Sequence, residues 1–522
     1  MQSCDGNYLT GSANEGNRNG SITESIKFIR NTKEQGEAGM KKQVYNPYLP
    51  SYEYIPDGEP RVFGDRLYIY GSHDKFGGSY YCENDYVCWS APLADLSDWK
   101  YEGVIFQHTD HPQDAVHRKA EKNGRYYLFA PDVIRGRDGR FYLYYSIADS
   151  SIISVAVCDT PAGQYRYLGD VCYPDGRILG EAAGEYFQFD PSIFIDDDGR
   201  IYLYSGFCPT NRTVDAFGRK FVGCHMYELE QNMLTVRKGP MLVIPREAKV
   251  PAGAVYFEAP SMRKINGIYY LVYSARNTGL YYFYSDRPDG DFRFGGRIHS
   301  TSDVGINGYS EEEPCCSMGN THGGLVELNG RYYIFDHRHT NNSSFCRQGV
   351  AEPVTIDKQG RIAQAEATSC GLNGGWLIGE GTYPAYIACV LYYEKTVPLE
   401  QRTACITQDG ADRETLPGQY IRGISNGCIV GYRYFEGNGL AGVRIRIRGK
   451  ASGTLYVTCH EEGGKITDPE QNNVGKTEIG LYTDEWQQLE IPVQISEKIY
   501  PLYLRFHGDG GFDLSEITLI AP

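Results

Sequence analysis

The chain has 522 residues, of which 44 are Tyr and 61 are Gly, and its formal net charge at pH 7 is −15. This length indicates two or three domains with a core that needs no disulfides. The acidic balance, without a basic stripe, argues against a nucleic-acid partner, and no segment approaches the roughly 18 consecutive apolar residues of a membrane span.

The first segment, residues 1–39, is polar and rich in Gly, Asn and Ser, so order is not expected there. A sharper pattern begins at Met40, a candidate natural start. The first 20 residues show no basic segment followed by an apolar one, so no signal peptide is expected. The 15 Cys residues are an odd number and form no CxxC motif. Reduced thiols and a cytoplasmic location are therefore predicted, with an extracellular location left open.

From residue 40 to 365, one phrase recurs five times: a turn containing Gly, then an alternating aromatic strand. The copies contain Gly64, Gly139, Gly199, Gly267 and Gly330, at separations of 75, 60, 68 and 63 residues. Asp-Gly and Asn-Gly turns before alternating runs are strong hairpin signals. Five such units predict an all-β fold with a five-bladed β-propeller over residues 40–365; a β-sandwich with long insertions is the alternative.

One polar residue lies seven to nine positions before each of these glycines: Asp57, Asp132, Asp190, Glu258 and His322. Blades are related by rotation, so equivalent positions meet on one ring, and we expect these side chains to face the central channel. Crowded carboxylates raise one another's pKa, so that one stays protonated near neutral pH. Cleavage of a glycosidic bond needs such a pair of acids in different protonation states.

After residue 365 the phrase stops. Residues 366–379 are predicted to be a connector. Residues 380–522 contain alternating runs such as AGVRIRIRG, QQLEIPVQI and PLYLRFHG, and no helical periodicity competes with them. A separate β-sandwich is therefore expected, which either binds polysaccharide or braces the propeller.

The phrases IPDGEPRVFGDRLYIYGSHD, FAPDV, FDPSIFIDDDGRIYL, FEAPSMRK and NTHGGLVELNGRYYIFDHRHT together resemble glycoside hydrolase family 43 over roughly residues 43–360. The resemblance implies that Asp57 is the catalytic base, Glu258 the general acid, and Asp190 the carboxylate that orients the acid and tunes its pKa. The motif around the base departs from the usual Asp-Pro. Glu59, on the same strand face as Asp57, is therefore its rival.

The resemblance also assigns residues around the acids. It implies that Asp132 forms a wall of the sugar pocket and that Arg347 contacts substrate. His322 would help to hold a calcium or other ion in the central channel through water, and no organic cofactor is expected. The C-terminal region, with YIRGISNGCIVGYRYFEGNG and GGFDLSEITLI, resembles carbohydrate-binding modules of family 6.

The function implied is an inverting glycosidase that releases α-L-arabinofuranose or β-D-xylose from plant cell-wall oligosaccharides or polysaccharides. Endo-arabinanase and exo-galactanase activities occur on the same scaffold and remain alternatives. A non-catalytic carbohydrate-binding propeller would tolerate loss of an acid, and the presence of Asp57, Asp190 and Glu258 argues against it. A protein-interaction propeller is a further option, but no repeat of the WD or Kelch type appears.

Overall fold

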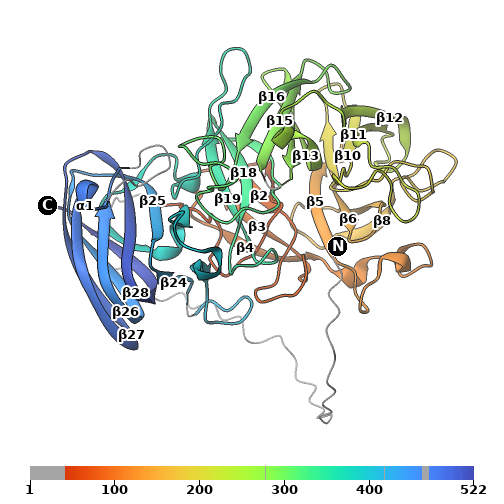
Figure 1. The fold of residues 1–522 in the computed structure, drawn as a ribbon. Coiled ribbons are helices and arrows are strands. Elements are labelled where there is room, and N and C mark those ends of the chain that lie inside the picture. Colours follow the sequence, from red (N-terminus) through yellow and green to blue (C-terminus); the bar gives the residue numbers. More distant parts are fainter. Residues whose placement is uncertain (1–41, 277, 417, 461–468) are drawn as a thin grey trace, which may run out of the picture. The chain divides into compact units, whose positions relative to one another are not determined.

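The computed structural model describes residues 42–276, 278–416, 418–460 and 469–522 (Figure 1). The predicted polar extension 1–39 and the start at Met40 lie outside the described residues. Within these ranges, no helix combines the length and apolar character needed to cross a membrane.

Five antiparallel sheets form the blades of a propeller (Figure 1). The first blade consists of β1 (Glu59–Phe63), β2 (Arg66–Tyr70), β3 (Tyr86–Pro92) and β4 (Lys100–Phe106). The second blade consists of β5 (Leu128–Arg135), β6 (Phe141–Ile147), β7 (Ile153–Cys158) and β8 (Arg166–Asp170). The third blade consists of β9 (Ser192–Ile195), β10 (Ile201–Ser205), β11 (Gly223–Leu229) and β12 (Val236–Pro245). The fourth blade consists of β13 (Tyr256–Ile265), β14 (Ile268–Ala275), β15 (Gly279–Ser285) and β16 (Arg293–His299). The fifth has three strands, β17 (Leu325–Leu328), β18 (Arg331–His339) and β19 (Arg347–Val354).

The innermost strands close the ring. β1 contacts β5, β5 contacts β9, β9 contacts β13, β13 contacts β17, and β17 contacts β1. Each phrase of the sequence forms the turn and second strand of a blade. Gly64, Gly267 and Gly330, in two-residue turns, have φ of 65°, 81° and 75°, which a residue without Cβ adopts at little cost.

The hydrophobic core of the propeller lies between neighbouring blades. Aromatic and aliphatic side chains of adjacent blades pack together there, and the cluster between the first two blades includes Tyr70, Tyr86, Leu128 and Val133. Four similar clusters fill the other spaces between blades. The Tyr-rich strands therefore serve packing between sheets, since each blade has a neighbouring blade on both of its faces.

The C-terminal region is one connected sheet of nine strands: β20 (Leu377–Ile378), β21 (Gly381–Pro384), β22 (Val390–Tyr393), β23 (Cys405–Thr407), β24 (Tyr420–Ser425), β25 (Cys428–Glu436), β26 (Leu440–Thr458), β27 (Gly475–Ile495) and β28 (Ile499–Ile520). β26 pairs with β27 on one side and with β28 on the other, and these long strands are blue in Figure 1. The helical elements are α1 (Pro469–Asn472) and the 3-10 turns η1 (His108–Asp110), η2 (His117–Ala120), η3 (Ala252–Ala254), η4 (Gly371–Asn373), η5 (Ala385–Ile387) and η6 (Leu399–Gln401). The structure confirms the all-β fold and the propeller followed by a β-rich region.

Candidate active site

The five innermost strands share one equivalent position near their start, six residues before the last paired residue ahead of the hairpin turn. We call it the axial position. It holds Asp57, Ala130, Asp190, Ala259 and His322. The first four have positive φ, between 30° and 61°, a conformation that costs non-glycine residues roughly 1–3 kcal/mol and that clusters at functional sites. Asp57, Asp190 and His322 are thus related by the rotation of the propeller. Glu258 lies one residue before this position, and Asp132 two residues after it.

Asp57 forms a buried ion pair. Arg347 Nη1 lies 3.1 Å from Asp57 Oδ1, and the same guanidinium binds both carboxylate oxygens of Asp74 at 2.8 and 2.9 Å. The backbone N–H of Asp57 donates to His337 Nδ1 at 3.2 Å. Burial alone would raise the pKa of Asp57, but Arg347, His337 and His322 oppose it and lower the value to about 2. Asp57 is therefore a carboxylate throughout the neutral range.

Glu258 and Asp190 have the opposite tendency. Burial, followed by the charges of Asp190 and Asp57, raises the pKa of Glu258 well above its usual range. Burial also raises the pKa of Asp190 to about 7, with His322 opposing the shift and Asp57 adding to it. Because each acid shifts the pKa of another, we treat Asp57, Asp190 and Glu258 as one acid cluster. It holds a protonated Glu258 and an ionised Asp57 at the same pH.

Glu59, the rival for the base, lies deeper along the strand and is 1% exposed. Its Oε2 accepts hydrogen bonds from Arg263 and from Ser261. Burial would raise its pKa, but Arg263 and His322 lower the value to about 2. Glu59 is therefore ionised but enclosed by protein, so the structure favours Asp57 as the group that could reach a water molecule.

His322 lies between two carboxylates. Its Nε2 is 3.7 Å from Glu59 Oε1 and its Nδ1 is 3.9 Å from Asp190 Oδ2. Burial lowers its pKa, yet Glu59, Asp190 and Asp57 together raise the value to about 9. The imidazole is therefore a cation near neutral pH, and it balances part of the negative charge on the axis.

The described side chains beside His322 offer few oxygens for direct coordination of a calcium ion. Calcium takes six to eight oxygen ligands, at about 2.3–2.6 Å. Among the described side chains at this level, Glu59 Oε1 is a buried oxygen without a hydrogen-bond partner, whereas both oxygens of Asp132 are engaged by Arg61. Arg61 and Arg263 already supply two positive charges there. We therefore assign no chemical step to a metal.

Asp132 is not brought into the acid cluster. It is fully buried, with its oxygens 2.9 and 2.5 Å from Arg61 Nε and Nη2. It also accepts the backbone N–H groups of Val133 and Ile193 at 2.8 and 2.9 Å. This placement ties the first three blades together at the axis and leaves Asp132 no exposed surface with which to form the expected wall of a sugar pocket.

Arg347 is 2% exposed. Besides Asp57 and Asp74, it contacts Cys82 Sγ at 3.6 Å, and its guanidinium lies 4.9 Å from the centre of the Tyr81 ring. The substrate contact implied for this residue stays a prediction.

Aromatic side chains near the acid cluster form an aromatic belt of Tyr81, Phe129, Phe189, Phe207, Phe257 and Phe345. All are partly exposed, and neighbouring ring centres lie 4.8–6.3 Å apart. Such faces suit the C–H surface of a sugar ring. Sequence reasoning did not single them out, although Phe189 directly precedes Asp190 and Phe257 directly precedes Glu258.

The C-terminal region braces the partners of Asp57. Asp412 Oδ1 accepts the backbone N–H of Phe76 at 2.7 Å, and its Oδ2 accepts Asn84 Nδ2 at 3.0 Å. The same amide group of Asn84 also donates to the backbone carbonyl of Asp74 at 3.0 Å. The link from Asp412 to Asp74 and on to Arg347 had no signal in the sequence, because it joins residues more than 300 positions apart.

Comparisons with known proteins show the family of the chain. The model of the family "Glycosyl hydrolases family 43" matches residues 53–362. A protein of Thermoclostridium stercorarium named "Xylosidase/arabinosidase" is 43% identical over 92% of this chain and 99% of its own length.

Two solved structures were also compared. A family 43 arabinoxylan arabinofuranohydrolase from Bacillus subtilis, in complex with cellotetraose, is 18% identical with a TM-score of 0.48, covering 91% of this chain and 97% of its own. A β-xylosidase/α-arabinofuranosidase from a compost microbial metagenome, in complex with xylotriose and in a calcium-free form, is 26% identical with a TM-score of 0.46, covering 60% and 95%.

Proposed function

This chain belongs to glycosyl hydrolase family 43, and on that premise we propose that it is an inverting glycosidase that releases terminal α-L-arabinofuranose and β-D-xylose from arabinoxylan and xylo-oligosaccharides. The proposal rests on the acid cluster, in which burial and the charges of Asp190 and Asp57 raise the pKa of Glu258 while the adjacent Arg347 holds the pKa of Asp57 low. The name of the T. stercorarium relative supports the choice of pentose substrates.

The mechanism follows from the protonation states. Glu258 donates its proton to the leaving oxygen of the glycosidic bond, and Asp57 accepts a proton from the water that attacks the anomeric carbon. An inverting enzyme holds its two carboxyl groups roughly 6.5–9.5 Å apart, which leaves space for this water. Asp190 adds negative charge beside Glu258 and so helps to keep Glu258 protonated.

The pocket around the reaction is assigned to the aromatic belt. Phe189 directly precedes Asp190 in the sequence, and Phe257 directly precedes Glu258. Both rings are partly exposed, so they can pack on the sugar and exclude water from it. Arg347 keeps Asp57 ionised and in place. A calcium ion held beside His322 through water is the alternative, and the positive charges of Arg61 and Arg263 in the channel oppose it.

The experiment is a panel of p-nitrophenyl α-L-arabinofuranoside, β-D-xyloside and β-D-galactoside with the wild type, Glu258→Gln and Asp57→Asn. We expect activity on the two pentosides, with a loss of about 10²–10⁴-fold in kcat for Asp57→Asn on these substrates and for Glu258→Gln on xylobiose, whose leaving oxygen needs the proton. Proton NMR of the first product would show inversion. A variant that keeps wild-type turnover would contradict the role given to that residue, and activity on the galactoside alone would contradict the substrate class.

A further inference from the structure

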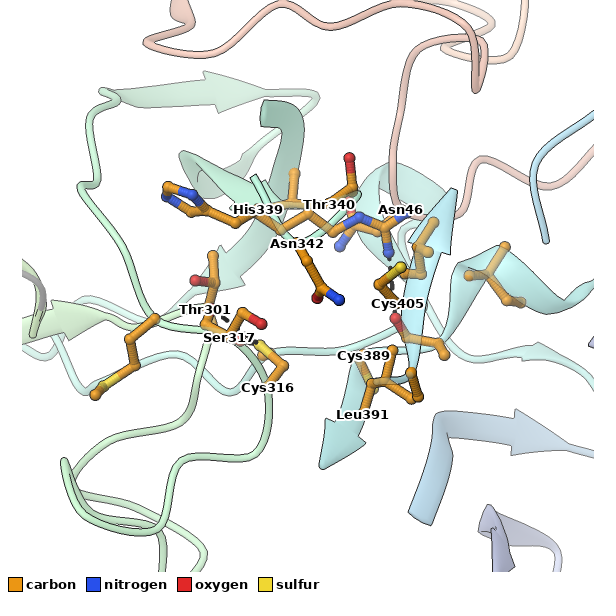
Figure 2. Close-up of a pocket in the computed structure, with 18 of the residues that line it drawn as sticks. Asn46, Thr301, Cys316, Ser317, His339, Thr340, Asn342, Cys389, Leu391 and Cys405 are labelled. Carbon is orange, nitrogen blue, oxygen red and sulfur yellow. Dashed lines mark hydrogen bonds between the residues drawn. The ribbon is translucent and has the colours of Figure 1, made fainter. Parts of the chain in front are cut away.

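A cavity of about 310 Å³ lies beside the fifth blade. Its walls are β18, the segment 316–318, and residues 387–391 and 404–406 of the C-terminal region. Figure 2 shows Asn342, Cys316, Cys389 and Cys405 around this space. We call it the fifth-blade cavity. Asp57, Asp190 and Glu258 are not among its lining residues, so it is distinct from the proposed catalytic site.

A buried guanidinium without a carboxylate partner lines this cavity. Arg338 is 8% exposed; its Nη1 donates to the carbonyl of Ala388 at 3.2 Å and its Nη2 to Gln348 Oε1 at 3.0 Å. Its Nε has no hydrogen-bond partner, and no carboxylate among the described residues lies within ion-pair distance. Burial lowers the pKa of Arg338 to about 10, so the group is still charged at neutral pH. A charge held in this way is costly unless something pairs with it.

A second nitrogen on the wall of the cavity is also unpaired. His299 is 1% exposed, and its Nδ1 lies 2.9 Å from Asp336 Oδ2, but its Nε2 has no partner among the described residues. The carboxyl group that lines the cavity belongs to Glu352. Its oxygens accept Asn46 Nδ2 and two donors of Thr368 at 2.7–2.9 Å. Burial raises the pKa of Glu352 well above its usual range, so it does not neutralise Arg338.

We propose that the fifth-blade cavity binds a hexuronic acid, a sugar ring bearing a carboxylate, with Arg338 as the group that receives the carboxylate. Arg carries five N–H donors in a planar fork that matches a carboxylate, and two of these donors are used by Ala388 and Gln348. Exposed Ser317, Asn342 and Ser344 on the lining provide an entrance with polar groups for sugar hydroxyls. The choice of a sugar acid, rather than another carboxylate, rests on the proposed glycosidase function.

The cavity also has room for a longer ligand. A second cavity, of about 630 Å³, shares five lining residues with it: Cys316, Ser317, Asn342, Leu391 and Ala404. The second cavity is lined by Tyr392 and Tyr393, whose rings suit a sugar chain. A hexuronate attached as a side branch to an oligosaccharide could therefore place its carboxylate at Arg338 and its main chain in the larger space.

The test is isothermal titration calorimetry of the full chain with D-glucuronate and with D-glucuronamide, which has the same ring and a neutral amide. We expect glucuronate to bind at one site and the amide to bind about tenfold or more weakly, since only the acid forms a charge-assisted pair. Equal affinities, or no binding of glucuronate, would overturn the proposal. Acetate binding as tightly as glucuronate would overturn its sugar part. If a xylo-oligosaccharide bearing a glucuronate branch binds more tightly than free glucuronate, the ligand is the branch. If the two bind equally, the ligand is the free acid.

Variants locate the site. Arg338→Gln is expected to weaken glucuronate binding about tenfold or more, and Arg338→Lys, which keeps the charge but loses the fork, to weaken it less. Arg361→Gln, at an exposed residue outside the cavity, is the matched control and should bind as the wild type does. Wild-type affinity in both Arg338 variants would contradict the proposal. If Arg338→Gln fails to fold, the comparison of acid with amide on the wild type still decides. Binding of glucuronate is measured without turnover. An enzyme that binds glucuronate but shows no glycosidase activity would therefore contradict the proposed function and leave the binding site in place.

Discussion

Arg347 and Asp57 are 290 residues apart in the chain, yet the Nη1 of Arg347 lies 3.1 Å from Oδ1 of Asp57 in the interior of the propeller. Because β19 carries Arg347 in the fifth blade and Asp57 opens the first blade, closure of the ring creates this pair. The protonation state of the proposed base therefore depends on the joining of the two ends of the propeller.

Arg347→Gln is expected to raise the pKa of Asp57, because the carboxylate loses its nearest cation. The base must be ionised to act, so the acid limb of the kcat/KM profile should move to higher pH. Loss of positioning should lower kcat by up to about a hundredfold. Rates on p-nitrophenyl α-L-arabinofuranoside between pH 3 and 9 measure both effects, with Arg361→Gln as control. An unshifted acid limb would separate Arg347 from the base.

Asp190→Asn is expected to act on the other limb. The charge of Asp190 raises the pKa of Glu258, so its removal should lower that pKa. Glu258 must be protonated to act as an acid, and the alkaline limb should therefore move to lower pH. Substrates with a good leaving group need less protonation and should lose less activity. An alkaline limb that stays in place would mean that Asp190 does not control Glu258.

Asp132→Ala tests the buried pair with Arg61. Removing one partner of a buried ion pair leaves the other charge unpaired and costs about 3–5 kcal/mol. We expect a lower Tm by differential scanning calorimetry, with KM unchanged in the folded enzyme. Asp175→Ala, which breaks an exposed pair with Arg177, is the matched control and should leave Tm nearly unchanged. A raised KM without loss of stability would instead support Asp132 as a pocket wall.

Removal of divalent cations tests the channel around His322. Because the described side chains offer a cation few free oxygens there, we expect activity and Tm to be the same in EDTA and after addition of CaCl₂. Activity that falls in EDTA and returns with calcium, but not with magnesium, would show that an ion binds despite this donor set.

The blades were predictable because their signals are local. A Gly in the turn and strict alternation after it specify a hairpin without help from distant residues, and all five phrases became blades. The pairings of Arg347 with Asp57 and of Asp412 with Phe76 were not predictable in the same way. They depend on how distant segments meet, and one sequence contains no record of such contacts.

The single-residue offsets in the ring have a physical cause. The hairpin turns differ in length, so the axial position lies seven residues before Gly64 but nine before Gly139 and Gly199, and eight before Gly267 and Gly330. Counting back from Gly therefore selected Asp132 in place of Ala130, and Glu258 in place of Ala259. For Glu258 the offset still leads to the acid cluster. For Asp132 the offset places the side chain in the buried ion pair with Arg61.

The hydrogen bonds of Asp412 join the C-terminal region to the segment that supports Asp74 and Arg347 in the propeller. A hybrid that joins this propeller to the C-terminal region of another protein would also have to supply an acceptor for Phe76 and Asn84, or the support behind Asp74 would loosen. Gain, loss or exchange of the C-terminal region during evolution would therefore have altered the support behind the proposed catalytic base.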